Sequence, residues 1–335
     1  MSVTRLGLIG AGFMGALHAH SLASLPEGQL VTVADVQEDR ARALAGADGA
    51  VYTDYREMLA REQLEAVLVA TSDDAHRDPC VAAAAAGLHV LVEKPLATSL
   101  ADCDAIAAAA QASGVKVLVG HTLRWEPRYA LAQQAIAAGG IGLVSYVFAR
   151  RNNIRAVAER VGRNTNVARF LAIHDIDWIQ WALGERATHV TARTVSRVLT
   201  DLGTPDAYFL LLRFASGALA CVEASWILPN QGSMQRDFQI EAVGSEGVLS
   251  ISVQDQGLRV DRAGGLQLPD ILYAPEIRGQ AQGVYVDELR HFLAVARGEA
   301  EPACTLPEAR AAVATVLAAE ASAATGAEAE VQGKR

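Results

Sequence analysis

The pattern Gly10-x-Gly12-x-x-Gly15, directly after an apolar run, constrains the fold of this chain more than any other feature. Residues 3–9 predict a buried strand, and residues 15–24 predict a helix. Glycines at these positions permit a tight turn, let the backbone approach a phosphate, and pack the helix against the strand. The sequence therefore predicts a pyrophosphate-binding turn, with candidate contacts at Gly10, Ala11, Gly12, Phe13, Met14 and Gly15.

Asp35 ends the next apolar run and lies 20 residues after Gly15. A βαβ unit places a carboxylate at about this distance, where it accepts hydrogen bonds from the adenine ribose. Because a carboxylate repels a 2′-phosphate, the sequence favours NAD over NADP, although Arg40 leaves NADP open. The alternative is that Asp35 only begins the turn into the next helix. Val36 is a further candidate contact.

Composition and charge limit the partners of the chain. The formal net charge of −9 argues against nucleic acid or an anionic membrane as a partner. The four cysteines are far apart in sequence and predict neither a metal site nor a redox pair. No apolar run approaches the ~20 residues of a membrane span, and no secretory signal is evident. We therefore expect a cytoplasmic protein without a bound metal.

The order of apolar and helical segments predicts two domains. Over residues 1–120, five apolar runs (3–9, 30–34, 67–70, 89–92 and 115–119) alternate with helical patterns, which predicts a doubly wound parallel sheet of the Rossmann type. Residues 121–325 predict an α+β domain with a large, mostly antiparallel sheet and helices on one face. Two final helices, residues 284–296 and 306–324, can pack back on the first domain. Residues 326–335 are expected to form a flexible tail.

Glu93-Lys94-Pro95 follows the fourth of these runs. Ligands of open α/β sheets bind beyond the carboxyl ends of the strands, so Lys94 is expected where a nicotinamide and a substrate meet. Pro95 restricts Lys94 to extended backbone geometry. A surface lysine at a strand end is the alternative.

Three more motifs complete a recognisable pattern: Ala70-Thr71-Ser72 with His76, Arg124-Trp125-Glu126-Pro127-Arg128-Tyr129, and Ile173-His174-Asp175-Ile176-Asp177-Trp178. With the glycine turn and the Glu-Lys-Pro motif, they resemble the Gfo/Idh/MocA oxidoreductases, a family that includes inositol and glucose–fructose oxidoreductases. The resemblance spans nearly the whole chain. It implies a Rossmann domain, an antiparallel-sheet domain and a bound nicotinamide cofactor. Further cofactor contacts implied at the strand ends are Ala70, Thr71, Ser72, Asp73, His76, Glu93, Lys94 and His121.

The resemblance also implies that Lys94 and His174 flank the reacting carbinol. An imidazole titrates near neutral pH and suits the base, and an ammonium stabilises developing alkoxide charge. We assign the proton to His174 and the electrostatic role to Lys94, with the reverse assignment open. The alternative for His174 is a structural residue on an apolar helix face.

One departure from the family concerns the partner of His174. Relatives commonly have an aspartate four residues earlier, where this chain has Phe170. Asp177 is the candidate catalytic support, because it lies three residues ahead on the helix. Either Asp177 or a group from elsewhere supports His174, or the histidine works without a carboxylate.

The candidate substrate contacts are Arg124, Asn153 and Asp175. For Arg124 an interdomain ion pair is the alternative. Residues 150–169 carry six arginines and four asparagines, which predicts either a solvated mobile loop or a cap that grips a charged sugar.

These features favour an NAD-dependent dehydrogenase that oxidises a secondary hydroxyl of a sugar, polyol or sugar derivative. Two alternatives remain: an enzyme that keeps its NAD and cleaves or rearranges a glycoside through transient oxidation, and a non-catalytic NAD-binding sensor or partner protein. An exposed antiparallel sheet needs covering, so we expect a homodimer or homotetramer formed through the C-terminal sheet.

Overall fold

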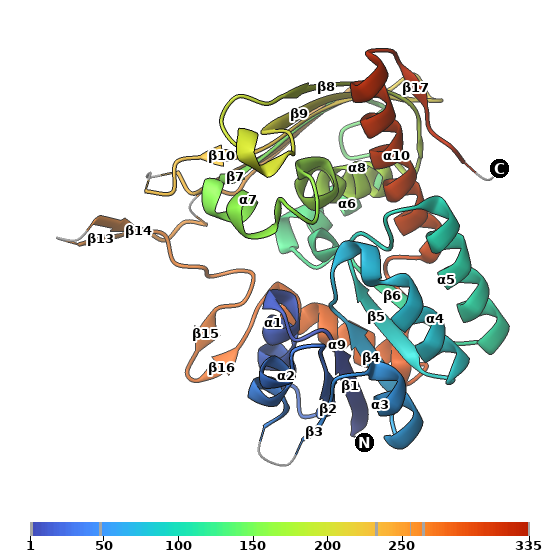
Figure 1. Cartoon of the computed structure of the whole chain (residues 1–335). Coiled ribbons are helices and arrows are strands. Elements are labelled where there is room, and N and C mark those ends of the chain that lie inside the picture. The colour runs from blue at the N-terminus through green and yellow to red at the C-terminus, as the bar shows by residue number, and fades with distance from the viewer. Residues whose placement is uncertain (1–2, 47–48, 232–233, 255, 263–264, 334–335) are drawn as a thin grey trace. The chain divides into compact units, whose positions relative to one another are not determined.

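The chain forms two compact units (Figure 1). The computed structural model describes residues 3–46, 49–231, 234–254, 256–262 and 265–333. The first unit consists of residues 1–125 and 270–310, and the second of residues 126–269 and 311–335. The sequence placed a single boundary after residue 120. The structural division lies a few residues later, and the first unit also contains a segment from the C-terminal third of the chain.

The first unit is built on a six-stranded parallel sheet with the order β3-β2-β1-β4-β5-β6. This order is the doubly wound dinucleotide-binding arrangement, as predicted. Its strands are β1 (Thr4–Ile9), β2 (Gly28–Ala34), β3 (Ala50–Tyr52), β4 (Ala66–Val69), β5 (His89–Glu93) and β6 (Val117–Gly120). All residues of β4 and β6 are buried, because helices cover both faces of a parallel sheet.

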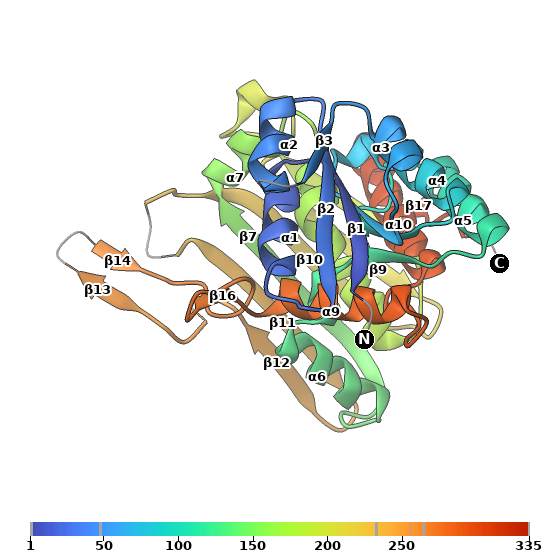
Figure 2. The ribbon, with the colours of Figure 1, turned by 90° about the horizontal axis from the view of Figure 1, so that it is seen from below.

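The helices of this unit cover the two faces of the sheet (Figure 2). Packing of α3 against α4 and of α4 against α5 covers one face, and α1 packs against α9 on the other. The helices are α1 (Phe13–Leu22), α2 (Glu38–Ala45), α3 (Tyr55–Arg61), α4 (Arg77–Ala85), α5 (Leu100–Ser113) and α9 (Val284–Ala296), with the short 3₁₀ turns η1 (Asp73–Ala75) and η2 (Thr122–Arg124). The segment 270–310 also carries two short strands, β15 (Glu276–Ile277) and β16 (Gln280–Ala281).

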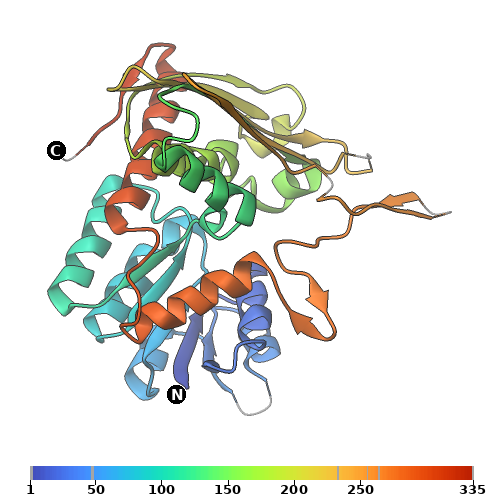
Figure 3. The same cartoon turned by 180° about the vertical axis from the view of Figure 1, so that it is seen from behind.

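Helix α9 is the late segment that completes the first unit (Figure 3). Leu289 and Leu293 on this helix are fully buried. A Cβ built on Gly28, at the start of β2, would lie 3.0 Å from the Leu293 methyl carbons. The return of α9 to the first unit follows from this apolar face, which needs a partner.

The second unit is built on a seven-stranded sheet with the order β12-β11-β7-β10-β9-β8-β17. Strands β7 and β10 are parallel, and the other neighbours are antiparallel. The strands are β7 (Val144–Ile154), β8 (Ala187–Val195), β9 (Ala207–Phe214), β10 (Leu219–Leu228), β11 (Arg236–Gly244), β12 (Val248–Ser252) and β17 (Ala329–Glu330). A separate pair, β13 (Val260–Arg262) with β14 (Gly265–Gln267), forms its own ribbon.

Helices pack on one face of this sheet, as the sequence predicted. They are α6 (Pro127–Ala137), α7 (Arg155–Val161), the π-helical turn η3 (Ala168–Ala172), α8 (Ile173–Leu183) and α10 (Leu306–Thr325), with a 3₁₀ turn η4 (Thr200–Leu202) between β8 and β9. For residues 150–169 the sequence left open a solvated loop or a cap over a sugar site. Instead they continue β7, form α7 and enter η3.

The expected flexible tail contains a strand. In β17, Ala329 and Glu330 pair with Val190 and His189 of β8. Ser322 Oγ donates to the carbonyl of Ala327 and accepts from the N–H of Ala192. These bonds fix residues 327–330 at the sheet edge, whereas the polar composition of the tail indicated only solvent exposure.

Among the described residues, no helix combines the length and the apolar character needed to cross a lipid bilayer.

Candidate active site

The glycine turn has the geometry that a pyrophosphate requires. Gly10 has φ +97°, and a Cβ there would lie 2.5 Å from the carbonyl oxygen of Ala70. A Cβ on Gly15 would lie 2.0 Å from the carbonyl oxygen of Gly10, so α1 starts in direct contact with the turn. A Cβ on Gly12, in contrast, would meet no described atom within 4 Å. Space beside Gly12 is therefore available to a ligand.

Two features beside the turn suit an NAD molecule. No acidic residue lies in the first turn of α1, so the positive end of the helix dipole favours a phosphate at this position. The Asp35 carboxylate accepts from the N–H of Ala11 at 2.7 Å and from the N–H of Gln37 at 2.8 Å. These bonds hold Asp35 beside the turn, and a carboxylate has further lone pairs for ribose hydroxyls. The residues present thus fit a dinucleotide, with Val36 exposed next to Asp35.

The Glu93–Lys94–Pro95 turn is held from two sides within the first unit. His18 Nε2, on α1, lies 2.7 Å from Glu93 Oε1. His76 Nδ1 donates to the carbonyl of Pro95 at 2.8 Å. Both histidines are buried, while Lys94 itself is half-buried. His76 is a candidate cofactor contact in the sequence. In the structure, its bond to Pro95 also helps to position the lysine turn.

The segment after β4 carries the other candidate cofactor contacts. Ala70 donates to the carbonyl of Ile9 and so lies beside the glycine turn. Thr71 Oγ1 donates to the carbonyl of Ala75, and Ser72 Oγ donates to Asp74 Oδ1. Asp73 begins η1. These residues follow a strand whose carboxyl end adjoins that of β1, as the prediction requires.

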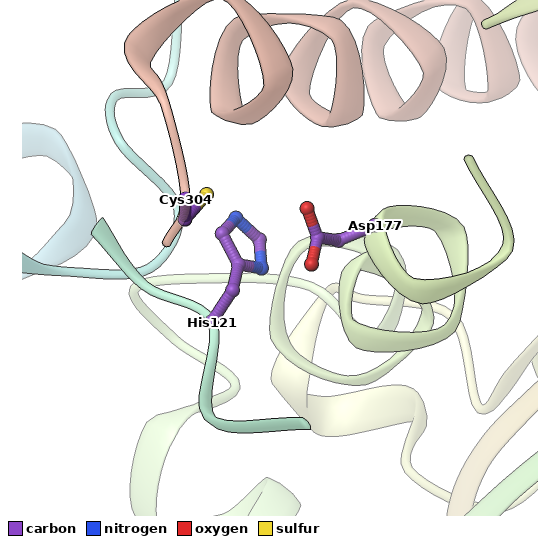
Figure 4. Close-up of side chains that lie close together, drawn as sticks. All are labelled: His121, Asp177 and Cys304. Atoms are coloured by element: carbon purple, nitrogen blue, oxygen red, sulfur yellow. The ribbon is translucent and has the colours of Figure 1, made fainter. Parts of the chain in front are cut away.

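His121 follows β6 and lies close to Cys304 (Figure 4). Both residues are buried, and a ring nitrogen of His121 lies within 4.8 Å of the Cys304 sulfur. One histidine and one cysteine are two of the four ligands that a structural zinc ion requires, so this pair by itself defines no metal site. Figure 4 also labels Asp177, which lies on α8 of the second unit.

Arg124 has contacts that argue against a role in substrate binding. Its side chain is only 1% exposed. The guanidinium donates to the carbonyl of Ala303 at 2.6 Å and to Glu308 Oε1 at 3.3 Å, all within the first unit. Arg124 therefore anchors the returning segment, and the ion pair expected as an alternative forms inside one unit.

In the second unit, His174 and Asp177 lie on α8, as predicted. His174 is half-buried and Asp177 is 2% exposed. Phe170, four residues before His174, lies in η3 with its ring centroid 6.3 Å from that of Trp226. The position is thus part of an apolar contact with β10.

Asp175 is a buried structural residue. Both of its carboxylate oxygens accept from Arg151, at 2.7 and 2.9 Å, and its exposed fraction is 0%. Arg151 also donates to the Tyr129 hydroxyl and stacks on Phe238. Burial raises the pKa of Asp175, and the charge and hydrogen bonds of Arg151 oppose this effect. These contacts argue against a direct substrate contact for Asp175.

Carboxylates bind several arginines of the segment 150–169. Arg150 pairs with Glu223 and Asp237 on neighbouring strands, and Arg169 pairs with Glu320 through two nitrogens. Asn153, the remaining candidate substrate contact, is half-buried at the end of β7 and accepts from the N–H of Ile154. The expected arginine cap is therefore not supported by Arg150, Arg151 or Arg169.

Sequence reasoning missed three residues around Glu93: His18, Tyr285 and Glu288. All three lie in the first unit, where His18 and Glu288 are buried and Tyr285 is half-buried. One signal was present, because Glu288 lies four residues from both Val284 and Phe292 on the apolar face of α9. An acidic residue on such a face indicates a partner or a shifted pKa.

Comparisons with known proteins agree with the fold and with an NAD-binding domain. Residues 4–121 match the model described as "Oxidoreductase family, NAD-binding Rossmann fold", and residues 129–250 match the "GFO/IDH/MocA C-terminal domain". The chain is 32% identical to inositol 2-dehydrogenase 2 of Saccharopolyspora erythraea, over 98% of this chain and 95% of that protein. It is 29% identical to D-apiose dehydrogenase of Paraburkholderia graminis, over 88% and 81%.

A solved structure shows the same fold with the cofactor bound. The crystal structure of GenD2 from gentamicin A biosynthesis in complex with NAD aligns with a TM-score of 0.87 and 27% identity, over 99% of this chain and 97% of that one. The glycine turn of residues 10–15 and the Asp35 carboxylate together form a cradle for the dinucleotide. This cradle and the fold define an NAD-binding oxidoreductase. The chain belongs to the Gfo/Idh/MocA family, and its cofactor is NAD.

We expect Gly12→Ala and Gly15→Ala to fail in different ways. Gly12→Ala adds a methyl group to open space, so the protein folds with an unchanged melting temperature, and the Kd for NAD rises by about 10-fold or more as the methyl meets the pyrophosphate. Gly15→Ala forces the turn apart and lowers the melting temperature. Differential scanning fluorimetry and NAD titration calorimetry measure both. An unchanged affinity of Gly12→Ala for NAD contradicts binding of the pyrophosphate beside Gly12.

We expect Asp175→Asn to lower stability, because it leaves the Arg151 guanidinium buried without its counter-charge. Removing one member of a buried ion pair costs about 3–5 kcal/mol. Urea unfolding measures the loss, and Asp201→Asn on an exposed turn is the control. If Asp175 binds substrate instead, KM rises while the unfolding midpoint stays in place.

Proposed function

We propose that this chain oxidises a secondary hydroxyl of a sugar, polyol or sugar derivative, with NAD preferred over NADP. The observation that carries this proposal is the double anchoring of the Lys94 turn by His18 and His76, beside a cradle that fits NAD. Relatives named inositol 2-dehydrogenase and D-apiose dehydrogenase support the class of substrate. Asp35 supports the preference for NAD, because its carboxylate repels a 2′-phosphate.

In the proposed mechanism, Gly10 to Gly15 bind the pyrophosphate and Asp35 binds the adenine ribose. NAD, when bound, supplies the acceptor for the hydride that leaves the carbinol carbon. His174 takes the hydroxyl proton as general base. The Lys94 ammonium stabilises the negative charge that develops on the oxygen. Because the backbone of the lysine turn is fixed, the positive charge of Lys94 needs little reorientation during the reaction. Asp177 is the proposed support for His174.

The role of Phe170 follows from the same proposal. Without a carboxylate one turn before His174, the imidazolium that forms on proton transfer gains no charge partner at that position. Asp177, three residues ahead on α8, is the proposed substitute. The product of the reaction is a ketone, and the proton leaves His174 to solvent after hydride transfer.

The proposal is tested by NADH formation across a panel of neutral, acidic and nucleotide-linked sugars, with NAD and NADP compared. We expect Lys94→Ala and His174→Ala each to lower kcat by about 100-fold or more, because each removes a group that acts in the transition state. Lys116→Ala and His189→Ala are the matched controls, since both residues lie outside the proposed site, and they retain the wild-type rate.

Retention of full activity by both Lys94→Ala and His174→Ala contradicts the mechanism. Turnover without added NAD indicates instead a glycosidase that retains its cofactor. Binding of NAD without oxidation of any sugar in the panel indicates a non-catalytic protein.

We also propose that the chain forms a homodimer or homotetramer through the open face of the second-unit sheet, in the cytoplasm. Large apolar side chains point away from the helix-covered face of this sheet and are 40–62% exposed; they are Tyr146, Phe209, Leu211, Leu219 and Val248. The strand register places Leu219 opposite Tyr146 and Leu211 opposite Cys221, so these side chains form adjacent rows. Such a surface is typical of a protein interface.

We expect Leu211→Arg to lower the mass measured by light scattering, because a charge in the centre of these rows opposes burial. Leu131→Arg, at an exposed position of α6, is the control and keeps the wild-type mass. A monomeric wild-type protein contradicts this assembly.

A further inference from the structure

Glu288 on α9 is a buried carboxyl group that neither the NAD cradle nor the proposed reaction uses. Its exposed fraction is 0%, and neither of its carboxyl oxygens has a hydrogen-bond partner within the described part of the chain. An ionised carboxylate in such a place has lost its hydration without receiving donors in exchange, which is strongly unfavourable. The neutral, protonated acid avoids most of this cost.

Glu288 lies under the carboxyl ends of β5 and β6. Glu93 and Gly120 are register partners on these two strands. A Cβ built on Gly120 would lie 3.6 Å from Glu288 Oε1 and 3.6 Å from Glu93 Cα. Two acidic residues therefore border one buried space, and Lys94 and His121 follow directly after the strands that end there.

Two hydrogen-bond donors in this space contact Glu93, whereas Glu288 has no donor within the described part of the chain. His18 Nε2 lies 2.7 Å from Oε1, and the backbone N–H of Lys94 donates to Oε2 at 3.3 Å. The His18 ring also meets Tyr285 edge to face, with centroids 6.0 Å apart. Because two neighbouring buried carboxylates cannot both stay ionised at low cost, the negative charge belongs on the acid that has donors.

The pKa directions agree with this geometry. Burial raises the pKa of Glu93, but the hydrogen bond and charge of His18, with Lys94 and His76, bring it below its usual value. Burial and the charge of Glu93 raise the pKa of Glu288 well above its usual value. Burial likewise raises the pKa of Tyr285, so that side chain remains a neutral phenol.

We propose that Glu288 holds a proton at neutral pH and acts as a positioning residue, a neutral acid that lets Glu93 stay ionised and hold the Lys94 turn through His18. The ionisable groups that act directly on Glu288 or on its charge are Glu93, the last residue of β5, and Tyr285 of its own helix; His18 of α1 and Lys94, which follows β5, act on Glu93. Others act on these groups from further away: His76 on Glu93, and Asp270 and Tyr273 on Tyr285. Arg124 of η2, which packs against α9, has its guanidinium on Ala303 and Glu308.

The proton on Glu288 is tested by the pH dependence of thermal stability in Glu288→Gln, a neutral isostere. Folding raises the pKa of Glu288, so the unfolded chain loses this proton first as the pH rises above about 4.5. Wild-type stability therefore falls relative to Glu288→Gln between that pH and the folded pKa. We expect the two proteins to have equal melting temperatures near about pH 4. Toward about pH 8, the melting temperature of Glu288→Gln should exceed that of the wild type by an increasing amount.

Asp287→Asn is the matched control, because Asp287 is the exposed neighbour on α9 and pairs only with Arg290 among the ion pairs that we observe. It should follow the wild type at every pH. A Glu288→Gln protein that is less stable than the wild type, or whose difference does not change with pH, overturns the proposal.

Glu93→Gln separates the two possible locations of the proton. We expect it to lower the melting temperature, because it removes the charge that pairs with His18. If Glu93 carries the proton instead, Glu93→Gln gains stability as the pH rises and Glu288→Gln loses it, which contradicts our assignment.

The positioning role rests on the proposed function and is tested separately. We expect Glu288→Ala to lower kcat by about 10-fold with little change in the KM for sugar, because the space left beside Glu93 lets the Lys94 turn shift, and a displaced Lys94 stabilises the transition state less. Glu288→Gln restores kcat, whereas a purely structural loss lowers the active fraction and is not rescued in this way. If Lys94→Ala proves fully active, the proposed function fails, but the melting data still decide the protonation of Glu288.

Discussion

The contact between His18 and Glu93 connects the two parts of the nucleotide-binding unit on which the proposed chemistry depends. His18 lies on the helix that begins at the glycine turn, and Glu93 precedes Lys94 at the end of β5. A 2.7 Å bond between buried partners gains strength from the low local dielectric. The orientation of the lysine turn is thereby coupled to the helix whose N-terminus faces the cofactor. Glu288 and Tyr285, from a segment almost two hundred residues later, enclose this bond.

Much of the first unit could be predicted from the sequence, since buried parallel strands are continuous apolar runs with glycine or polar residues at their ends. The runs before Gly10, Asp35 and Lys94 are strands β1, β2 and β5 as predicted. Strand β3 was missed, because its three residues at the sheet edge carry too weak a pattern. The return of α9 was only an option in the sequence, because pattern within a helix does not say which distant surface will cover its apolar face.

The site could be predicted in outline from motif spacing, which placed Lys94, Asp35 and His174 on strand ends or a helix. The roles of Arg124, Asp175 and the arginine segment could not be predicted. Their partners, among them Glu308, Arg151 and Glu320, are between 24 and 184 residues away in sequence, and local patterns contain no information on such pairs. The sequence showed an unusual excess of arginine, and the structure shows carboxylates that neutralise several of these charges. An apparent binding surface was thus in part a set of internal ion pairs.

The discontinuity of the first unit has a consequence for its biogenesis. The α1 face that α9 covers remains exposed while the ribosome adds strands β7 to β12 of the second sheet, since α9 begins only at Val284. The Rossmann half, although encoded first, is therefore finished after the core of the second unit has been made. A nascent chain that stops after residue 125 exposes apolar helix surface and leaves Glu93 without the segment that encloses it. Any chain that ends between residue 125 and Val284 therefore lacks part of both units, the first as well as the second.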